Sequence, residues 1–424
     1  MIRIFDFNTV SDREIFGRTQ DAFNVEDIVS EIISNVKTQK DAALLAYTEK
    51  FDKVALDSLQ VSEQEITEAF NQSDPEFIRV MRDAAANIRD YHKNQVRQGF
   101  EIKKNGGIVL GQKITPLAKV GIYVPGGTAA YPSTVLMNSI PAKLAGVGEI
   151  VMVTPPGKDG KVNPAILCAA KIAGVDKVFK VGGAQAVAAL AYGTESIPCV
   201  DKIVGPGNAF VAEAKRQVYG KVAIDMIAGP SEILVLADGK SDPAFVAADL
   251  LSQAEHDKMA SAVLVTDSAE LALQVQAEVE TQLAALPRYE IARSSIDNFG
   301  KIIVCSDLWQ AIDVANRIAP EHLEICVDDP FPYLDKIKNA GSVFLGRYCP
   351  EALGDYYAGT NHTLPTSGTA RFSSALSVDD FIKKISYTYY DKNAIQKAAP
   401  DIALFARKEG LDAHARSAEI RLKL

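Results

Sequence analysis

The sequence has little cysteine and histidine, and it lacks long apolar runs. Its five cysteines lie far apart and form no Cys-x-x-Cys pair, which argues against a disulfide framework and a cysteine-based zinc site. Its apolar runs, such as residues 150–153 and 233–236, are far shorter than the ~18 residues of a membrane-spanning helix. No basic region followed by an apolar core opens the chain, so no secretory signal is visible. These absences predict a cytoplasmic protein with reduced thiols and no membrane partner.

Positive charge is also scarce. The chain has 45 Lys and Arg against 54 Asp and Glu, a formal net charge of −9, and its basic residues are scattered. A nucleic acid partner requires a basic surface, so we expect a small-molecule partner instead. The length of 424 residues fits two or three domains, and the hydrophobic share of 47% is typical of a globular protein.

The order of apolar patterns predicts an α/β protein. The first hundred residues are mostly helical in pattern, from Asn24 onward, and a hairpin is expected at residues 100–110 around Asn105-Gly-Gly107. From Val120, short β-rich runs alternate with Ala-rich helical stretches in two blocks that meet near Gly229-Pro-Ser231. Such alternation is typical of parallel sheets with helices on both faces. The last ~45 residues are expected to return to helix.

Three glycine-bearing turns follow predicted strands within residues 124–208. They are Val124-Pro-Gly-Gly127, Val181-Gly-Gly-Ala-Gln185 and Gly205-Pro-Gly-Asn208. None is a G-x-G-x-x-G fingerprint, and each alone is more often a structural turn. Three such turns in one block favour a nucleotide-like ligand, because glycine lets backbone amides approach a phosphate at the carboxyl ends of strands.

Histidine marks a second candidate site, because four of the five lie in the second half of the chain, most beside another polar or acidic residue. These segments are Gln253-Ala-Glu-His256, Pro320-Glu321-His322, Gly354-Asp355 with Asn361-His362, and Ala413-His414. The i, i+3 spacing of Gln253 and His256 lets both side chains reach one ion. A single helical histidine is more often a surface or capping residue, so spacing alone supports only a mixed nitrogen and oxygen metal site with open coordination. We expect His92, among charged helix residues, at the surface.

Ordered motifs extend from about residue 20 to the end of the chain. They are Val120-Gly-Ile-Tyr-Val-Pro-Gly-Gly127, Tyr131-Pro-Ser-Thr-Val-Leu-Met137, Gly182-Gly-Ala-Gln-Ala-Val187, Gly205-Pro-Gly-Asn208, Ile224-Asp-Met-Ile-Ala-Gly-Pro-Ser-Glu232, Asp249-Leu-Leu-Ser-Gln-Ala-Glu-His256, Pro320-Glu-His-Leu323, Gly354-Asp355, Gly359-Thr-Asn-His362 and Glu409-Gly-Leu-Asp-Ala-His414. In these motifs the sequence resembles the bacterial histidinol dehydrogenase family. The resemblance implies NAD-dependent, zinc-dependent oxidation of L-histidinol through L-histidinaldehyde to L-histidine, the final steps of histidine biosynthesis, with two NAD molecules reduced.

The resemblance also implies roles for single residues. It makes Glu321 and His322 the acid–base pair. It assigns one zinc per subunit to Gln253, His256, Asp355 and His414, with the zinc holding the imidazole and amine of the substrate. The implied substrate contacts are Ser231, Gln253, His256, His322, Asp355, Glu409 and His414. The implied NAD contacts are Tyr123, Gln185 and Asn208, and His362 is expected to lie just behind the zinc ligands.

The resemblance implies a domain organisation as well. We expect two incomplete Rossmann-like parallel-sheet domains with a helical N-terminal segment and a helical C-terminal tail. After an N-terminal segment (1–20), one discontinuous domain (21–122 with 233–376) carries the metal and acid–base residues. It encloses an inserted NAD-binding domain (123–232). The tail (377–424) is expected to be exchanged in a homodimer, so that Glu409 and His414 serve the neighbouring subunit.

Two other classes of function remain open at this point. A zinc hydrolase could use Glu321 to activate water, but it would leave the three glycine turns unexplained. A non-catalytic α/β binding protein would require no metal-binding constellation. Production of NADH from histidinol separates both from the dehydrogenase.

Overall fold

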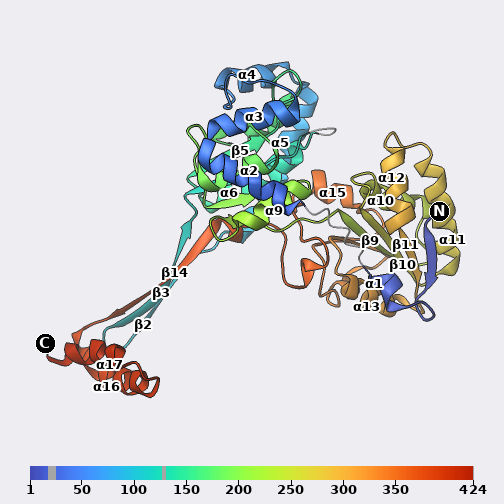
Figure 1. Cartoon of the computed structure of the whole chain (residues 1–424). Coiled ribbons are helices and arrows are strands. Elements are labelled where there is room, and N and C mark those ends of the chain that lie inside the picture. The colour runs from blue at the N-terminus through green and yellow to red at the C-terminus, as the bar shows by residue number, and fades with distance from the viewer. Residues whose placement is uncertain (18–24, 127–129, 424) are drawn as a thin grey trace. The chain divides into compact units, whose positions relative to one another are not determined.

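The computed structural model describes residues 1–17, 25–126 and 130–423 (Figure 1). The expected helix start at Asn24 and the turn glycine Gly127 lie outside these residues. The chain forms two compact units: residues 1–95 with 118–381, and residues 96–117 with 382–424. The first unit contains two parallel sheets, which confirms the expected α/β class.

The first parallel sheet has the strand order β6-β5-β4-β7-β8. Its strands are β4 (Lys119–Tyr123), β5 (Glu149–Thr154), β6 (Lys177–Lys180), β7 (Lys202–Val204) and β8 (Ala223–Ile224). From the central strand β4 the chain builds β5 and β6 on one side, then crosses over to build β7 and β8 on the other. This doubly wound order places the point at which strand order reverses between β4 and β7, where such sheets bind ligands at their carboxyl edge.

Helices cover the first sheet on both faces. Those between its strands are α6 (Pro132–Ala145), α7 (Pro164–Ala173), α8 (Gly183–Tyr192) and α9 (Ala209–Val218). The N-terminal helices are α2 (Glu26–Gln39), α3 (Asp41–Asp52), α4 (Glu63–Gln72) and α5 (Pro75–His92), followed by the 3₁₀ turn η1 (Lys93–Gln95). Val29 and Leu44 join Phe179 and Val187 in one hydrophobic core, so the N-terminal helices belong to this sheet.

The expectation that His92 lies at the surface is wrong. The side chain is fully buried, because Ile78, Met81, Ala85, Ile88 and His92 form the apolar face of α5 at three- and four-residue spacing. The ring Nδ1 lies 2.7 Å from the amide oxygen of Gln95, and burial lowers the pKa of the imidazole. His92 is therefore a core residue with a satisfied ring.

The second parallel sheet has the order β1-β11-β10-β9-β12-β13. Its strands are β1 (Arg3–Asp6), β9 (Glu232–Ala237), β10 (Ser261–Thr266), β11 (Lys301–Val304), β12 (His322–Cys326) and β13 (Ser342–Leu345). Helices α10 (Pro243–Ala254), α11 (Ala269–Leu283) and α12 (Tyr289–Phe299) pack on one face, and α1 (Asp12–Phe16), α13 (Leu308–Ile318) and α14 (Phe331–Leu334) on the other. Without the added edge strand β1, its strand order repeats that of the first sheet.

The second unit is an antiparallel sheet with two helices. The hairpin of β2 (Phe100–Lys104) and β3 (Ile108–Pro116) is confirmed, and Gly106 and Gly107 at its turn have φ values of 89° and 79°. β14 (Ile382–Tyr390) pairs with β3, and α16 (Lys392–Lys408) and α17 (Asp412–Glu419) follow it (Figure 1). The expectation of an entirely helical tail is wrong for Ile382–Tyr390, where isoleucine and tyrosine favour a strand.

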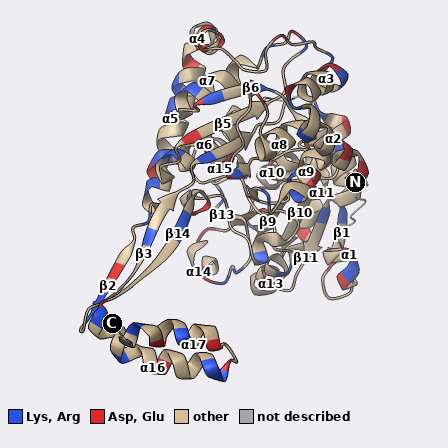
Figure 2. Cartoon of the chain, turned by 60° about the vertical axis from the view of Figure 1, so that its left-hand side comes forward, with Lys and Arg blue, Asp and Glu red and all other residues tan. Residues whose placement is uncertain are grey.

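The remaining short elements are the helix α15 (Glu351–Tyr356) and the 3₁₀ turns η2 (Thr369–Arg371), η3 (Val378–Phe381) and η4 (Ile420–Lys423). Acidic and basic residues are interspersed along α16 and α17 (Figure 2). Among the described residues no helix has the length and apolarity to cross a membrane.

Candidate active site

Glu321 and His322, the pair expected to carry the acid–base chemistry, lie at the amino edge of the second sheet, where β12 begins beside β9. His322 Nδ1 lies 2.9 Å from the carbonyl oxygen of Glu232, and the backbone N–H of Glu232 donates to Glu321 Oε2 over 2.9 Å. Glu321 and His322 thus bind the backbone N–H and C=O of Glu232, respectively. Because a carbonyl can only accept, Nδ1 carries the proton and Nε2 is left as the acid–base atom.

Two carboxylates of helix α15 face His322 Nε2. Asp355 Oδ1 lies 3.5 Å from it and Glu351 Oε1 lies 3.8 Å from it. Glu351 and Asp355 share a helix face because they are four residues apart. The ligand atoms of all three side chains lie within 4.8 Å of one another, close enough to hold one ion. Glu351 was not expected from the sequence, although its i, i+4 spacing to Asp355 was a usable signal.

Gln253 is fully buried in the last turn of α10. Neither polar atom of its amide has a hydrogen-bond partner among the described residues, and the same holds for His322 Nε2 and Glu351 Oε1. An unpaired buried amide costs about 1–3 kcal/mol. These three groups with unpaired polar atoms, beside the Asp355 carboxylate, are suited to a bound cation. The donor set of imidazole, amide and carboxylate suits zinc, so the residues present fit the metal that the resemblance implies.

Charge and burial act against each other in this cluster. Burial raises the pKa of Glu321 to about 8, although His322 and the Glu232 N–H act in the opposite direction. Burial lowers the pKa of His322, but the carboxylates of Glu321, Asp355 and Glu351 outweigh it and raise that pKa above its ordinary value. Burial also lowers the pKa of His256, and the Asp355 carboxylate raises it. The surplus of carboxylates attracts either protons or a cation.

A second layer of side chains fixes helix α15. Glu324, two residues after His322 on β12, accepts the backbone N–H of Glu351 over 2.6 Å. Ser252 of α10 donates to Glu351 Oε2 over 3.1 Å, so α15 is tied to both β12 and α10. Burial raises the pKa of Glu324 and of Asp249, and the charge of Asp249 raises that of Glu324 further.

Ser231 and His362 border the same edge. Ser231 directly precedes Glu232, and its carbonyl accepts the N–H of Ser261 over 2.9 Å. His362 Nε2 lies 3.3 Å from Thr134 Oγ1, and burial lowers the pKa of this imidazole, while the Asp355 carboxylate raises it. The charge of Asp355 thus acts on His362, whose place behind the zinc ligands stays a prediction.

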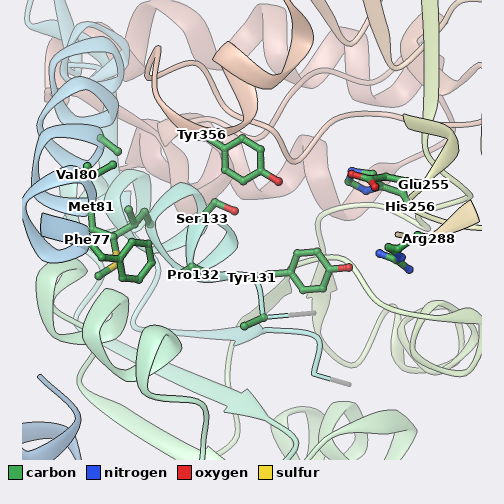
Figure 3. Close-up of a pocket in the computed structure, with 13 residues that line it drawn as sticks. Phe77, Val80, Met81, Tyr131, Pro132, Ser133, Glu255, His256, Arg288 and Tyr356 are labelled. Carbon is green, nitrogen blue, oxygen red and sulfur yellow. The ribbon is translucent and has the colours of Figure 1, made fainter. Parts of the chain in front are cut away.

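A pocket of about 330 Å³ opens beside His256. Figure 3 shows Phe77, Val80 and Met81 of α5 on one side and His256 with Arg288 on the other. Tyr131 and Tyr356 lie between these two groups of side chains. The pocket has room for a small molecule beside His256.

The three expected NAD contacts lie at the carboxyl edge of the first sheet. Tyr123 ends β4, and its hydroxyl accepts the N–H of Gly183 over 3.0 Å; burial raises the pKa of this phenol to about 12. Gln185 is buried in the first turn of α8. Asn208 is exposed and caps α9, accepting the N–H groups of Phe210 and Val211 over 3.1 and 3.2 Å. Two helix N-termini therefore meet this edge.

Glu409 and His414 belong to the second unit, and all other expected site residues belong to the first. Glu409 follows α16 and His414 lies on α17; both side chains are exposed. Their participation in the site is not shown by the fold of either unit.

The fold and the site together describe an α/β protein with a buried Glu–His pair beside a cluster of side chains that could hold a metal ion. The histidinol dehydrogenase family model matches residues 17–422. A histidinol dehydrogenase from Streptococcus mutans is 57% identical over 403 residues, 95% of this chain and 94% of that protein. One from Bacillus subtilis is 56% identical over 393 residues, 93% of this chain and 92% of that protein.

A solved structure agrees with these relatives. The crystal structure of histidinol dehydrogenase from Elizabethkingia anophelis superposes with a TM-score of 0.95 at 42% identity, covering 100% of this chain and 98% of that one. The chain belongs to the histidinol dehydrogenase family. It is an oxidoreductase of histidine biosynthesis that acts on an alcohol and an aldehyde.

Proposed function

We propose that the chain oxidises L-histidinol through L-histidinaldehyde to L-histidine, using two NAD molecules and one zinc ion per subunit. The observation that carries the proposal is the buried cluster in which Gln253, His322 and Glu351 have unpaired polar atoms beside Asp355. A hydrolase could use the same cluster, but it has no use for the glycine-bearing edge of the first sheet. Localisation in the cytoplasm and the domain boundaries at residues 123 and 232 stay predictions.

The test is NADH production from histidinol, followed by absorbance, before and after dialysis against a chelator. We expect two NADH per histidinol, loss of the signal after dialysis and recovery on adding zinc. Histidinol-independent esterase or amidase activity without NADH would favour the hydrolase instead. Binding of histidinol without turnover in the zinc-loaded protein would favour the non-catalytic class.

Zinc would be held by Gln253 and His256 at the end of α10 and by Asp355 of α15, with His414 completing the set. When bound, zinc would orient the imidazole and amine of the substrate, and NAD would accept the hydride. Helix α15, anchored by Glu324 and Ser252, holds Asp355 against the edge of β12. The same anchoring keeps the ligands within reach of the acid–base pair.

The acid–base pair divides two tasks. A cation bound among the carboxylates would offset their effect on the pKa of His322, so that Nε2 can take the hydroxyl proton as the alcohol is oxidised while Nδ1–H is fixed on the Glu232 carbonyl. Oxidation of the aldehyde first requires addition of water to its carbonyl carbon. Glu321 is held through Oε2 by the Glu232 N–H, and its carboxylate can take the proton of that water. His322 then takes the hydroxyl proton of the hydrate in the second oxidation.

NAD is assigned to the first sheet because the two sheets differ at the point where strand order reverses. In the second sheet Arg347 fills the carboxyl ends of β9 and β12. It donates to Asp238, which follows β9, over 2.9 Å and to the Cys326 carbonyl at the end of β12 over 2.8 Å, and its side chain is 14% exposed. The first sheet carries the glycine-bearing turns and helix N-termini at this place.

A dimer with exchanged tails would bring Glu409 and His414 to the site of the neighbouring subunit. The second unit has a small core of its own, consisting of Ala403, Ala406 and Ala415. Leu404 and Phe405 of α16 are 61% and 69% exposed. Exposed apolar residues of this size favour burial against another chain.

Mixing two inactive variants tests the shared site. His322→Ala removes the base of the first unit, and His414→Ala removes the ligand of the second. When the two proteins are unfolded, mixed in equal amounts and refolded, half of the dimers are hybrids. With exchanged tails, each hybrid has one intact site, so we expect about a quarter of wild-type NADH production. If the tail serves its own subunit, every site carries one lesion and the mixture stays inactive.

A further inference from the structure

Lys215 and Asp225 form a buried ion pair behind the glycine turn that follows β7. Their side chains are 2% and 1% exposed. Lys215 lies on the buried face of α9, and Asp225 directly follows β8 within the Ile224–Glu232 motif. Neither residue takes part in the reaction proposed above. Two fully buried charges are costly to desolvate, and an apolar pair of similar volume is often at least as stable. The pair therefore calls for an explanation other than stability.

The ion pair forms hydrogen bonds with both the backbone C=O and the backbone N–H of Gly205. Lys215 Nζ donates to the Gly205 carbonyl over 3.0 Å, and the Gly205 N–H donates to Asp225 Oδ2 over 2.7 Å. The second carboxylate oxygen accepts the N–H of Met226 over 2.6 Å. Because the next residue is Pro206, the turn has one backbone donor fewer with which to fix itself. The Lys215–Asp225 pair with its hydrogen bonds to Gly205, called the clamp below, fixes the backbone of the turn in place of that missing donor.

Gly205 is pressed against the residue that ends β4. Its φ is +114°, and a Cβ at this position would lie 2.1 Å from the carbonyl oxygen of Tyr123. Glycine alone tolerates this close approach and this φ. The clamp thus fixes the end of β7 against the end of β4, on the two sides of the point where strand order reverses.

The clamp also fixes the start of α9. Asn208 caps this helix three residues after Gly205, and Lys215 lies two turns further along it. Lys215 therefore ties the helix back to the beginning of its own turn. Asp225 joins the same turn to the neighbouring strand, since its N–H donates to the Ile203 carbonyl of β7 over 3.2 Å.

We propose that Lys215 and Asp225 are positioning residues for NAD: their ion pair clamps Gly205 so that Tyr123 and Asn208 keep the spacing that the dinucleotide requires. The inference rests on the proposed placement of NAD at the first sheet. Neither side chain is accessible to the ligand, so both act through the turn. Their loss should weaken binding of NAD alone, because the histidinol cluster belongs to the second sheet.

The decisive variant is Lys215→Met/Asp225→Asn, which removes both charges and keeps the approximate shape. Asparagine can still accept the Gly205 N–H, whereas methionine cannot bind its carbonyl. We expect the KM and the dissociation constant for NAD to rise by about 10- to 100-fold, as misplacement of a binding loop predicts. The KM for histidinol at saturating NAD, and the zinc content, should stay within about twofold of wild type.

The single variants and a control complete the experiment. Asp225→Asn should bind NAD more tightly than Asp225→Ala, because only asparagine preserves the acceptor for Gly205. Arg216→Gln, next to Lys215 on α9, removes the exposed pair with Glu213 and should leave the NAD constants unchanged. A folded double variant with wild-type NAD affinity would overturn the clamp. So would equal losses of NAD and histidinol affinity with a lowered melting temperature, which indicate a general structural role.

Wild-type titrations separate this inference from the proposed function. If NAD binds the wild-type protein and Asn208→Ala weakens it, the placement of NAD stands, and the Lys215 variants judge the clamp alone. If Asn208→Ala and the clamp variants all bind NAD as wild type does, the placement of NAD at the first sheet is wrong. The proposed role of Lys215 and Asp225 in NAD binding is then wrong as well.

Discussion

Gln253→Met is expected to weaken zinc binding by about 10²–10³-fold and at the same time to stabilise the metal-free protein. The Gln253 amide is fully buried and both of its polar atoms lack partners among the described residues. Methionine has a similar length and needs no hydrogen bonds. Removing an unsatisfied buried amide should raise the free energy of unfolding of the chelator-treated protein by about 1–3 kcal/mol.

The expected loss of zinc affinity follows from the share of the binding free energy that each ligand contributes. Structural zinc sites contribute about 10–16 kcal/mol, so one ligand of four accounts for about 2.5–4 kcal/mol, or about 10²–10³-fold in affinity. Elemental analysis after dialysis measures the zinc, and urea denaturation in chelator measures the stability. Lower zinc affinity together with higher stability of the metal-free protein is expected only for a residue whose role is to bind the metal.

Gln282, a partly buried glutamine, provides the control. The amide nitrogen of Gln282 donates to the Ala244 carbonyl over 2.9 Å and to Glu278 over 2.9 Å, so both of its N–H groups are satisfied. Gln282→Met should therefore lower stability and leave the zinc content unchanged. Full zinc content in Gln253→Met, or destabilisation equal to that of Gln282→Met, would show that Gln253 is a structural amide.

The sequence predicts those parts of the site that are close together in the chain. Glu321 and His322 are neighbours, and Gln253 and His256 are one helical turn apart, so local geometry brings each pair to one place. The structure adds that Asp355 lies beside His322 and that its charge acts on His256, which depends on the packing of α10 and α15 against β12. No spacing along the chain encodes that packing.

Residues that act through burial were missed for the same reason. Glu324 looks like an ordinary charged strand residue, but it is 1% exposed and accepts the N–H of Glu351. His92 looks like a surface residue among charges, yet it lies on the apolar face of α5. Arg347 becomes significant only because the doubly wound order brings the ends of β9 and β12 together. In each case tertiary contacts override the local pattern.

The fold, like the site, can be predicted from the sequence only where the local pattern decides it. Alternating strands and helices indicate parallel sheets, and both sheets are present. The edge strand β1 and the nine-residue strand β14 were not expected, because their pairing partners, β11 and β3, lie far away in sequence. Short or lysine-containing strands carry a weak local signal, and non-local pairing decides them.

Glu321→Gln is expected to separate the two oxidations. Glutamine can still accept the Glu232 N–H, so the edge of β9 and the orientation of His322 should be preserved, but its amide cannot take a proton from water. We expect oxidation of supplied histidinaldehyde to slow by about 10²–10⁴-fold, the usual contribution of a general base. The first hydride transfer from histidinol should slow by less than about tenfold.

Single-turnover kinetics measure the two steps separately, with histidinol or histidinaldehyde mixed with excess NAD and enzyme. His322→Ala is the matched comparison, since His322 serves proton transfer in both oxidations and its loss should slow both. The competing interpretation is that Glu321 only orients His322, because Glu321 Oε2 lies 3.7 Å from the imidazole Nδ1. In that case Glu321→Gln would slow both half-reactions equally. Selective slowing of the second instead assigns the activation of water to Glu321, since the carboxylate is the group that the variant removes.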